Sequence, residues 1–516
     1  MKRTLGVCLC AALLLCLLAG CTEEIPEYIP TGGALDSDTP HTRPTTDPQK
    51  PEEKQISLAY NAEAGMNPLL TMSFTNRMLF TLIYQGLFTV NNEYECSPIL
   101  CKNYNVTSDM KTYTFYLEEA YFSDGTALTA ADVVASLEAA RSSDYYGGRL
   151  QHVDSITAYG DVVVIELDTP MENLPILLDI PIIKADEIEA EQPLGTGPYR
   201  VDGEKLKRQA GWWCTASLRI SCDEIPLVNC TSAAQVRDAF ELGGVGMACA
   251  DQAVYNRIPY HGDYELWDCE NGLFFYFVCN SKSEIFSNEA VRSTLTYAID
   301  RDKLVETYYG GFAYSASLPA SPLSPYYSST LAGRYDYEPQ RFYDAVAQSG
   351  LLENVPEGEK RELRLLVNSD DRLRLAVAEE IAGMLEKAGF AVKLVKISNA
   401  NFVSQLRWGT YDLYLAQTKL SANMDLSAFY AVNGSLSYGG MTNAELYFLS
   451  TEALANSGNY SSLHEKVMED GQLCPILFQS YAVYVRRATF SDLAPARDAV
   501  FYYDLGRTMA DALMKE

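Results

Sequence analysis

Histidine is scarce in this chain, and its cysteines and histidines do not occur at the short spacings typical of zinc sites. Only four of the 516 residues are histidines, and neither a CxxC nor an HxxxH pair is present. Structural zinc sites and zinc hydrolases depend on such pairs. The nucleophile motif GxSxG and the phosphate-binding motif GxxxxGK[ST] are also missing. We therefore predict no metal, no cofactor and no enzymatic activity.

Positive charge is also in short supply. The chain has 40 lysines and arginines against 68 aspartates and glutamates, which gives a formal net charge of −28 at pH 7. A surface of this sign repels the phosphates of nucleic acids and of anionic lipid headgroups. The composition therefore excludes nucleic acid as a partner. It does not indicate a cationic ligand, because acidic surfaces also keep proteins soluble.

Long apolar runs are absent after the signal-like N-terminus. The run Leu5–Leu18 follows Lys2 and Arg3 and is too short to span a bilayer, as in a secretory signal. It leads into Leu-Ala-Gly-Cys, which matches the bacterial lipobox, where the cysteine thiol takes a diacylglycerol. We predict a lipoprotein signal peptide over residues 1–21, lipidation at Cys21 and contact with a membrane through this lipid anchor. An ordinary signal peptide that ends near a cysteine is the alternative.

Residues 22–54 have the composition of a tether. They contain six prolines, many threonines and acidic residues, and almost no bulky apolar side chains. Such a segment buries too little surface to offset the entropy of ordering, and its prolines keep it extended. We predict a disordered tether that holds a folded body away from the membrane. The body, of about 460 residues, is long enough for two or three domains.

Nine cysteines follow Cys21, and this odd number leaves at least one thiol unbridged or bridged to another chain. Cys96 and Cys101 bracket a short loop, so a disulfide between them is one interpretation. The interpretation that we favour is that most of the nine are small buried hydrophobic residues.

The body alternates strand-like and helix-like segments. Residues 56–60 and 111–117 have the alternation of strands, and residues 76–86 place their apolar side chains on one face of a helix. Thr129 and Asp132 form a capping-box pattern at the start of another helix. These features predict structure, and none of them carries chemistry by itself.

The clearest unit begins with a predicted strand at Leu363–Val367. Residues 372–388 are typical of a helix with apolar residues at four-residue spacing, and Gly389 stands where a C-terminal cap is expected. Further strands are predicted over residues 391–397 and 411–416. A strand–helix–strand unit of this length predicts a crossover connection and a parallel sheet.

Taken in order, several segments resemble the bacterial extracellular solute-binding proteins of the peptide/nickel class, family 5. The most diagnostic stretch is Tyr113–Leu117 followed by Phe122–Val134, with its Asp-Gly turn and helix start. Gly195–Tyr199 matches the GTGPY motif of the family. The other similar segments are residues 82–88, Asn280, 291–301, 336–339 and 363–415.

The resemblance implies an α/β, two-lobed periplasmic-binding-protein-like fold (type II, large peptide-binder class) with mixed sheets and a hinge. It places lobe I at residues 55–279, with residues 475–516 returning to it, and lobe II at residues 280–474. The chain then crosses between the lobes near Asn280 and near Cys474-Pro475. In this family a solute is enclosed between the lobes by hinge closure.

The function implied is that of an extracytoplasmic solute-binding lipoprotein of an ABC importer. Such a protein captures an oligopeptide or a similar small solute and delivers it to the transmembrane subunits of a permease. Its location is the outer face of the cytoplasmic membrane, or the periplasm. Two alternatives stay open: a receptor for peptide signals of the pheromone type on the same fold, and an extracellular hydrolase that uses paired carboxylates.

Peptide-binding members of the family grip the backbone of the solute like an added strand, and the resemblance implies two such gripping segments. The first follows the strand at residues 56–60 and contains Tyr60, Asn61, Ala62 and Glu63. The second follows the strand at residues 411–416. The candidate contacts in and before the second segment are Asn401, Lys419, Ser421, Ala422, Asn423 and Asp425.

The second segment departs from the peptide-binding pattern at two positions. Ala422 stands where peptide binders have the aspartate that pairs with the α-amino group of the peptide, and Lys419 stands at an aromatic position. A buried amine needs an anionic partner, which Asp425 or Glu63 could supply instead. Lys419 could meet a carboxylate of the solute. The departure weakens the peptide assignment and leaves the solute-binding assignment unaffected.

Overall fold

The computed structural model describes residues 56–214, 222–251, 264–353, 355–486, 494–497, 499–502 and 507–514. All of them belong to one compact unit of the chain. The predicted signal peptide, Cys21 and the tether lie outside the described residues. Within the part that is described, no helix combines the length and the apolar character needed to cross a membrane.

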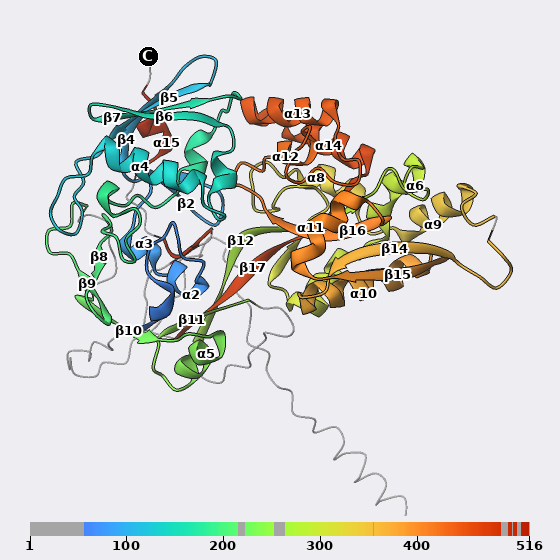
Figure 1. The fold of residues 1–516 in the computed structure, drawn as a ribbon, viewed down its shortest axis with the longest axis horizontal. Coiled ribbons are helices and arrows are strands. Elements are labelled where there is room, and N and C mark those ends of the chain that lie inside the picture. The colour runs from blue at the N-terminus through green and yellow to red at the C-terminus, as the bar shows by residue number, and fades with distance from the viewer. Residues whose placement is uncertain are drawn as a thin grey trace, which may run out of the picture. The chain divides into compact units, whose positions relative to one another are not determined.

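The largest sheet has seven strands and mixes parallel and antiparallel pairs. Its two longest strands, β12 (Tyr264–Cys279) and β17 (Leu473–Arg486), pair antiparallel and run side by side in Figure 1. The order is β11-β17-β12-β16-β14-β15, with β13 paired to β17. The other strands of the sheet are β11 (Met247–Asp251), β13 (Ala313–Ser315), β14 (Arg361–Asn368), β15 (Phe390–Ile397) and β16 (Leu413–Lys419).

The strand–helix–strand unit predicted from residue 363 onward is confirmed. β14 pairs in parallel with β15 along its whole length and with β16 at two residues. α10 (Arg372–Glu386) connects β14 to β15 and buries its apolar face. Gly389, just beyond the helix, has φ 103°, a conformation that glycine adopts without a Cβ clash.

Smaller sheets form the rest of the β structure. One four-stranded sheet has the order β1-β10-β9-β8 and another has the order β4-β5-β7-β6. Two hairpin-like pairs, β2 with β3 and β18 with β19, complete it. The bounds are β1 (Leu58–Tyr60), β2 (Phe88–Val90), β3 (Cys96–Pro98), β4 (Cys101–Val106), β5 (Thr112–Leu117), β6 (Val153–Tyr159), β7 (Val162–Leu167), β8 (Tyr199–Val201), β9 (Lys205–Arg208), β10 (Glu224–Asn229), β18 (Ala494–Ala496) and β19 (Ala499–Tyr502).

The helix predicted over residues 76–86 is divided into two short helices, α2 (Phe74–Arg77) and α3 (Phe80–Ile83). The capping box is confirmed, since the Thr129 N–H donates to Asp132 Oδ2 at 2.9 Å at the start of α4 (Ala130–Arg141). The remaining helices are α5 (Ala233–Glu241), α6 (Glu289–Thr294), α7 (Arg301–Leu304), α8 (Ser329–Ala332), α9 (Pro339–Gln348), α11 (Asn399–Trp408), α12 (Ser427–Tyr430), α13 (Ala444–Ala455), α14 (Tyr460–Asp470) and α15 (Met509–Ala512).

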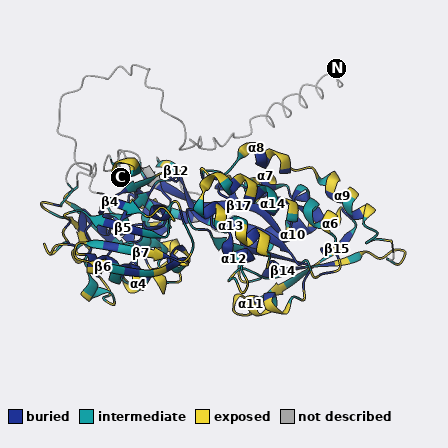
Figure 2. Cartoon of the chain, turned by 90° about the horizontal axis from the view of Figure 1, so that it is seen from above, coloured by how far each residue is buried: buried dark blue, intermediate teal, exposed yellow. Residues whose placement is uncertain are grey.

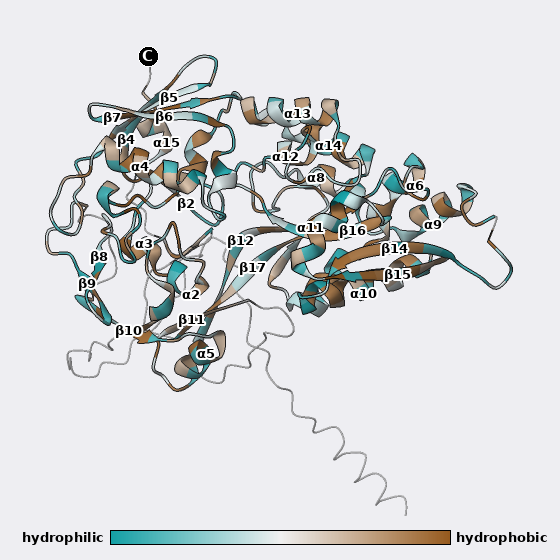
Figure 3. Ribbon diagram, viewed as in Figure 1, coloured by the Kyte–Doolittle hydropathy of each residue, from teal (hydrophilic) through white to brown (hydrophobic). Residues whose placement is uncertain are grey.

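Two large apolar clusters hold these elements together. The first gathers the inner faces of α3, α4 and the sheet β4-β5-β7-β6, and the second packs α10 against β14, β15 and β16. Figure 2 shows β12 and β17 buried along most of their length and α11 with many exposed residues. Figure 3 shows hydrophobic residues concentrated on β14 and β15. Burial of these apolar faces is the main source of stability.

Cys96 and Cys101 do not form a disulfide in this structure, and both are thiols. Cys101 is fully buried, and burial raises the pKa of its thiol to about 12. The interpretation of buried hydrophobic cysteines therefore describes Cys101 well.

Candidate functional site

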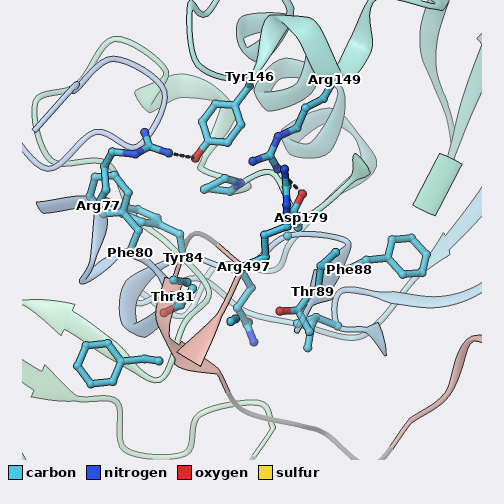
Figure 4. A pocket seen from close by; sticks show the side chains of 18 of the residues that line it. Arg77, Phe80, Thr81, Tyr84, Phe88, Thr89, Tyr146, Arg149, Asp179 and Arg497 are labelled. Atoms are coloured by element: carbon cyan, nitrogen blue, oxygen red, sulfur yellow. Dashed lines mark hydrogen bonds and ion pairs between the residues drawn. The ribbon is translucent and has the colours of Figure 1, made fainter. Parts of the chain in front are cut away.

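A cavity of about 80 Å³ lies among α2, α3, β2, the 3₁₀ turn η2 (Gly147–Leu150) and β19. Figure 4 shows its labelled side chains. Three arginines line it, Arg77, Arg149 and Arg497, and Asp179 is the only carboxylate among the described residues of its wall. The lining is therefore rich in positive charge, in a chain whose formal net charge is −28. We call this space the arginine cavity.

Aromatic rings hold two of these arginines. The guanidinium carbon of Arg77 lies 3.1 Å from the centre of the Tyr145 ring, and Arg77 Nη2 donates to the Tyr146 hydroxyl at 3.4 Å. Arg149 forms a salt bridge with Asp179, and its guanidinium carbon lies 5.1 Å from the centre of the Tyr146 ring. Figure 4 shows Tyr146 between Arg77 and Arg149. Cation–π contacts orient a guanidinium without neutralising its charge.

Arg497 is fixed more tightly than the other two. Its Nε lies 3.8 Å from Glu270 Oε2, and both side chains are at most 1% exposed. Its Nη2 also donates to the Leu420 carbonyl oxygen at 2.6 Å. A buried pair of this kind is costly to break, because either partner alone would be an uncompensated charge. Arg497 therefore forms a rigid part of the cavity wall.

A second hollow, of about 450 Å³, adjoins the arginine cavity, because Tyr145 and Arg149 line both. Lys419, at the end of β16, reaches this junction. Its Nζ donates to the Tyr145 hydroxyl at 2.7 Å and lies 4.3 Å from the centre of the ring. The lysine predicted to meet an anion thus lies beside two aromatic-held arginines. We call this second space the junction hollow.

The structure brings Ser421 and Asp425 to the junction hollow and buries Ala422 and Asn423 away from its lining. The Ser421 hydroxyl donates to Asn423 Oδ1 at 2.7 Å. Asn423 Nδ2 in turn approaches Met171 Sδ at 3.8 Å. Of the four predicted residues, only Ser421 and Asp425 therefore offer polar atoms to this hollow.

Asp425 is engaged by a histidine from a distant segment. His152 Nε2 lies 2.9 Å from Asp425 Oδ2, and the Gln151 amide also donates to this carboxylate. The Ser427 N–H donates to the other oxygen at 2.7 Å, and His152 Nδ1 lies 3.2 Å from Asp168 Oδ1. Asp425 is therefore already satisfied, which reduces its capacity to hold an amine of the solute.

His152 and Asp425 each shift the pKa of the other. Burial lowers the pKa of His152, but the hydrogen bonds and charges of Asp425 and Asp168 outweigh burial, so the pKa is raised overall from 6.5. Burial raises the pKa of Asp425, but the hydrogen bond and charge of His152 and the hydrogen bonds of Ser427 lower it overall from 3.8. The pair therefore favours His152 charged and Asp425 ionised.

The first predicted segment lies at a separate hollow of about 560 Å³, whose lining includes Asn61 and Ala64. Its N–H groups are committed to internal hydrogen bonds. Asn61 N–H donates to Asn76 Oδ1 at 2.7 Å, Ala62 N–H donates to Asn229 Oδ1 at 3.0 Å, and Glu63 N–H donates to Asn61 Oδ1 at 3.0 Å. A solute strand laid on this segment would therefore meet few available donors.

A tilted pair of aromatic rings lies between this hollow and the junction hollow. Phe74 lines the first, Tyr481 lines the second, and their ring centres are 4.4 Å apart. Tyr60, Ala62 and Glu63 lie next to Asn61 outside this lining. Asn401 lies apart from all of these spaces, exposed on α11, where its amide donates to Ser398 Oγ at 3.2 Å.

Comparison with known proteins identifies the family. Residues 95–440 match the family described as bacterial extracellular solute-binding proteins, family 5, middle part. The chain belongs to this family. The resemblance found in the sequence motifs is thereby confirmed, and with it the prediction of an α/β, two-lobed binding-protein fold with mixed sheets.

Family 5 relatives bind different solutes. The oligopeptide-binding protein AppA of Bacillus subtilis is 24% identical over 399 residues, which cover 68% of this chain and 72% of AppA. The glutathione-binding protein GsiB of Pectobacterium atrosepticum is 26% identical over 312 residues, which cover 56% of this chain and 58% of GsiB. The match thus spans less than two thirds of GsiB.

A solved structure shows the same fold. NikA from Brucella suis in complex with Fe(III)-EDTA superposes with a TM-score of 0.69 at 18% identity, over 86% of this chain and 98% of NikA. At this identity the likeness concerns the fold alone. In the described part of this family 5 protein, no group of three or more histidine, cysteine or acidic residues is placed to hold a metal ion.

One group of side chains resembles a catalytic triad in its hydrogen bonds, with Ser427 in the place of the nucleophile, His152 in that of the base and Asp168 in that of the orienting acid. His152 Nε2 lies 3.2 Å from Ser427 Oγ. In a catalytic triad the serine is accessible to the substrate. In this family 5 protein Ser427 is only 3% exposed, and Asp425 lies closer to the same histidine nitrogen, at 2.9 Å. The arrangement therefore lacks the accessible serine of a catalytic triad.

Sequence reasoning missed Arg77, Tyr145 and Arg149. One signal for the first was present, because Arg77, Thr81 and Gln85 recur at four-residue spacing on the polar side of the predicted helix. Tyr145 and Arg149 follow the end of α4, the second of them in the short turn η2, and their segment has no periodic pattern. Only the packing of this segment beside β16 brings them to Lys419.

The His152–Asp425 pair predicts a pH-dependent stability. Since the folded-state pKa of His152 is above 6.5, its contribution is complete below that pH and is lost as the pH rises through the folded-state pKa. Since the pKa of Asp425 is below 3.8, its contribution is present above that pH and is lost in stronger acid. The stability lost in His152→Gln should therefore be largest between about pH 4 and pH 6.5.

Urea unfolding of both proteins across pH 4 to pH 9 measures this difference. The exposed Glu379→Gln variant on α10 is the control, and its difference from the parent should stay small throughout. A His152→Gln difference that grows above pH 7 would contradict the assignment.

Proposed function

We propose that this family 5 protein captures an oligopeptide or a similar small solute outside the cytoplasm and delivers it to the transmembrane subunits of an ABC permease. The observation that carries the proposal is the meeting of two hollows at Tyr145 and Arg149 in a member of a solute-binding family. The junction hollow, at about 450 Å³, has the size of small-molecule sites. Relatives named for oligopeptide and glutathione binding support a peptide-like solute.

We propose the same division into lobes as the sequence predicts, with residues 55–279 and 475–516 in one lobe and residues 280–474 in the other. The antiparallel pair β12 and β17 supports this division, since the proposed crossings lie at one end of both strands. The register of the pair is interrupted between Glu270 and Phe274. Irregularities of this kind bend a strand, and this one lies within the proposed lobe I, a few residues before the crossing near Asn280.

Among the proposed contacts, Lys419, Ser421 and Asp425 have the support of lining the junction hollow. Cys21 is the proposed lipid attachment site, supported by the preceding Leu-Ala-Gly. The lipid anchor would hold the body at the outer face of the cytoplasmic membrane, or in the periplasm.

The test combines identification of the solute with a transport measurement. Native mass spectrometry of protein purified from its host should detect a bound small solute that is released on denaturation. A strain without the protein should take up that solute more slowly. Lys419→Met should restore uptake poorly, whereas the exposed Lys396→Met control should restore it fully. Unchanged uptake in the deletion strain, or conversion of the solute into a product, would contradict the proposal.

A further inference from the structure

We propose that Met171, Glu172 and Asn173 form a latch that holds the two proposed lobes closed, so that a contact away from the solute controls how readily the site opens. The inference rests on the proposed division into lobes, and it concerns opening and release rather than capture. The three residues belong to the proposed lobe I, and they contact residues of the proposed lobe II. We call them the latch.

The latch is held firmly on its own lobe. The Tyr113 hydroxyl donates to the carbonyl oxygens of Met171 at 2.6 Å and of Glu172 at 3.0 Å. The Met171 N–H donates to the Met110 carbonyl oxygen at 3.1 Å. Tyr113 lies on β5 and is only 1% exposed. The remaining groups of the latch are therefore presented in a fixed direction.

Glu172 joins the ends of two helical segments of the proposed lobe II. α13 ends at Ala455, and the 3₁₀ turn η8 (Ser457–Asn459) follows it. The last carbonyl groups of a helix and the first N–H groups of the next have no partner within the helix. The Glu172 N–H donates to the Leu454 carbonyl oxygen at 2.8 Å, and the Ser457 N–H donates to Glu172 Oε2 at 2.7 Å. One residue of lobe I thus satisfies an acceptor and a donor of lobe II.

The residues on either side of Glu172 meet a surface that is itself held together. Asn173 Nδ2 donates to the Tyr326 hydroxyl at 3.3 Å, and Asn423 Nδ2 lies 3.8 Å from Met171 Sδ. The Tyr326 ring stacks on the Tyr460 ring with their centres 4.3 Å apart. The Tyr460 hydroxyl donates to the Asn423 carbonyl oxygen. The latch therefore closes on a surface that lobe II forms by its own contacts.

The latch lies apart from the proposed solute site. Among the described residues that line the arginine cavity and the junction hollow, none belongs to the latch. A contact that exists only in the closed form stabilises that form whatever solute is bound. The latch therefore raises the affinity for different solutes by the same factor and slows their release. Discrimination between solutes is left to the residues of the hollows.

Hydrogen exchange of the full chain in detergent, read by mass spectrometry, tests the latch. Glu172→Ala should lower the protection of residues 453–459 about threefold or more, because a hydrogen bond to a carboxylate is lost. Protection should also fall in residues 148–152 and 419–427, which contain the His152–Asp425 pair across the same proposed boundary. A change confined to residues 168–174 and 453–459, or no change, would overturn the latch, because opening must affect both contacts.

Ser457→Pro tests the same contact from the other lobe, because proline removes only the donor N–H. Proline is favoured at the first position of a helix, and Asn456 before it has the extended conformation that precedes proline, with φ −149° and ψ 107°. The same pattern of lost protection is expected. The matched controls are Glu119→Ala, at an exposed glutamate, and Ala444→Pro, at the exposed first residue of α13. Both controls should leave exchange at the two contacts unchanged.

The outcomes distinguish the latch from the transport proposal. The solute identified by native mass spectrometry should dissociate about threefold faster or more from Glu172→Ala and Ser457→Pro. Lost uptake in the deletion strain, with unchanged exchange and dissociation in both latch variants, would overturn the latch and leave the transport function intact. Unchanged uptake in the deletion strain, with lost protection at both contacts, would overturn the transport function and support the latch.

Discussion

Replacing Gly197 by alanine should lower the free energy of unfolding by about 3 kcal/mol, the upper part of the range for overpacked sites. Gly197 belongs to the GTGPY segment, and its N–H donates to the Ile83 carbonyl oxygen at 2.9 Å. A Cβ at this position would lie 2.5 Å from the Ile83 carbonyl carbon and 2.7 Å from the Leu82 oxygen. These are backbone atoms of α3 and its end, which cannot move aside like a flexible side chain.

The effect should extend from stability to the arginine cavity. The carbonyl oxygen of Thr196, next to Gly197, accepts a hydrogen bond from the Trp212 indole N–H at 2.8 Å. The indole N–H of the next residue, Trp213, donates to Gln85 Oε1, and Gln85 lines the arginine cavity. Chemical denaturation of the parent and the variant measures the loss of stability, and binding of the solute identified by native mass spectrometry measures the loss of the site. We expect both in Gly197→Ala.

Gly383 provides the control for the same substitution. It lies exposed inside α10, and a Cβ there would meet no atom within 4 Å. Alanine in a helix interior is favoured over glycine by about 0.5–1 kcal/mol. Gly383→Ala should therefore stabilise the protein slightly. Equal stability of the two alanine variants would show that the close packing at Gly197 is not the reason for glycine there.

Replacing Arg301 by methionine should lower the free energy of unfolding by about 3 kcal/mol or more, since several buried acceptors would lose their donor. Arg301 is 5% exposed. Its Nε donates to the carbonyl oxygens of Ala316 at 3.1 Å and Pro475 at 3.0 Å, and its Nη2 donates to Thr296 Oγ1 at 2.7 Å. The guanidinium thus connects the start of α7 to two segments that are distant in sequence.

Methionine keeps most of the apolar volume, so the variant isolates the loss of hydrogen bonds. Arg341→Met is the matched control, because Arg341 is half exposed in its salt bridge with Glu338. A surface pair contributes little, and this variant should change the stability by about 0.5 kcal/mol or less. Denaturant unfolding of both variants measures the difference. A small loss in Arg301→Met would indicate that water replaces the guanidinium.

Local patterns were sufficient for several elements. The spacing of apolar residues in α10, with Gly389 beyond its end, predicts the helix and its position between two parallel strands. The Thr129–Asp132 capping box likewise predicts the start of α4. In each case the information lies within a few residues, and the structure agrees. The helix predicted over residues 76–86 is interrupted at Met78 and Leu79. The spacing of apolar residues alone does not predict this interruption.

The candidate site was predicted less completely. Lys419 was found because it departs from the pattern of peptide binders, and its position beside Tyr145 agrees with a role at the hollow. Asn401 was a candidate contact that the structure leaves apart from every space described above. Tyr145 precedes the short 3₁₀ turn η2 and Arg149 lies in it, so no spacing pattern indicates them. The contact of Tyr145 with Lys419 joins residues 274 positions apart, and the salt bridge of Arg149 with Asp179 joins residues 30 positions apart.

The motifs of the sequence alone determined the family and the α/β class, because the residues that carry them lie close together and shape their own turns, caps and strands. The tertiary structure decided which charges meet. It paired Asp425 with His152, placed Lys419 on Tyr145 and gathered Arg77, Thr81 and Gln85 at one cavity. Burial and charge pairing depend on segments far apart in the chain, and such contacts exist only after the fold has brought these segments together.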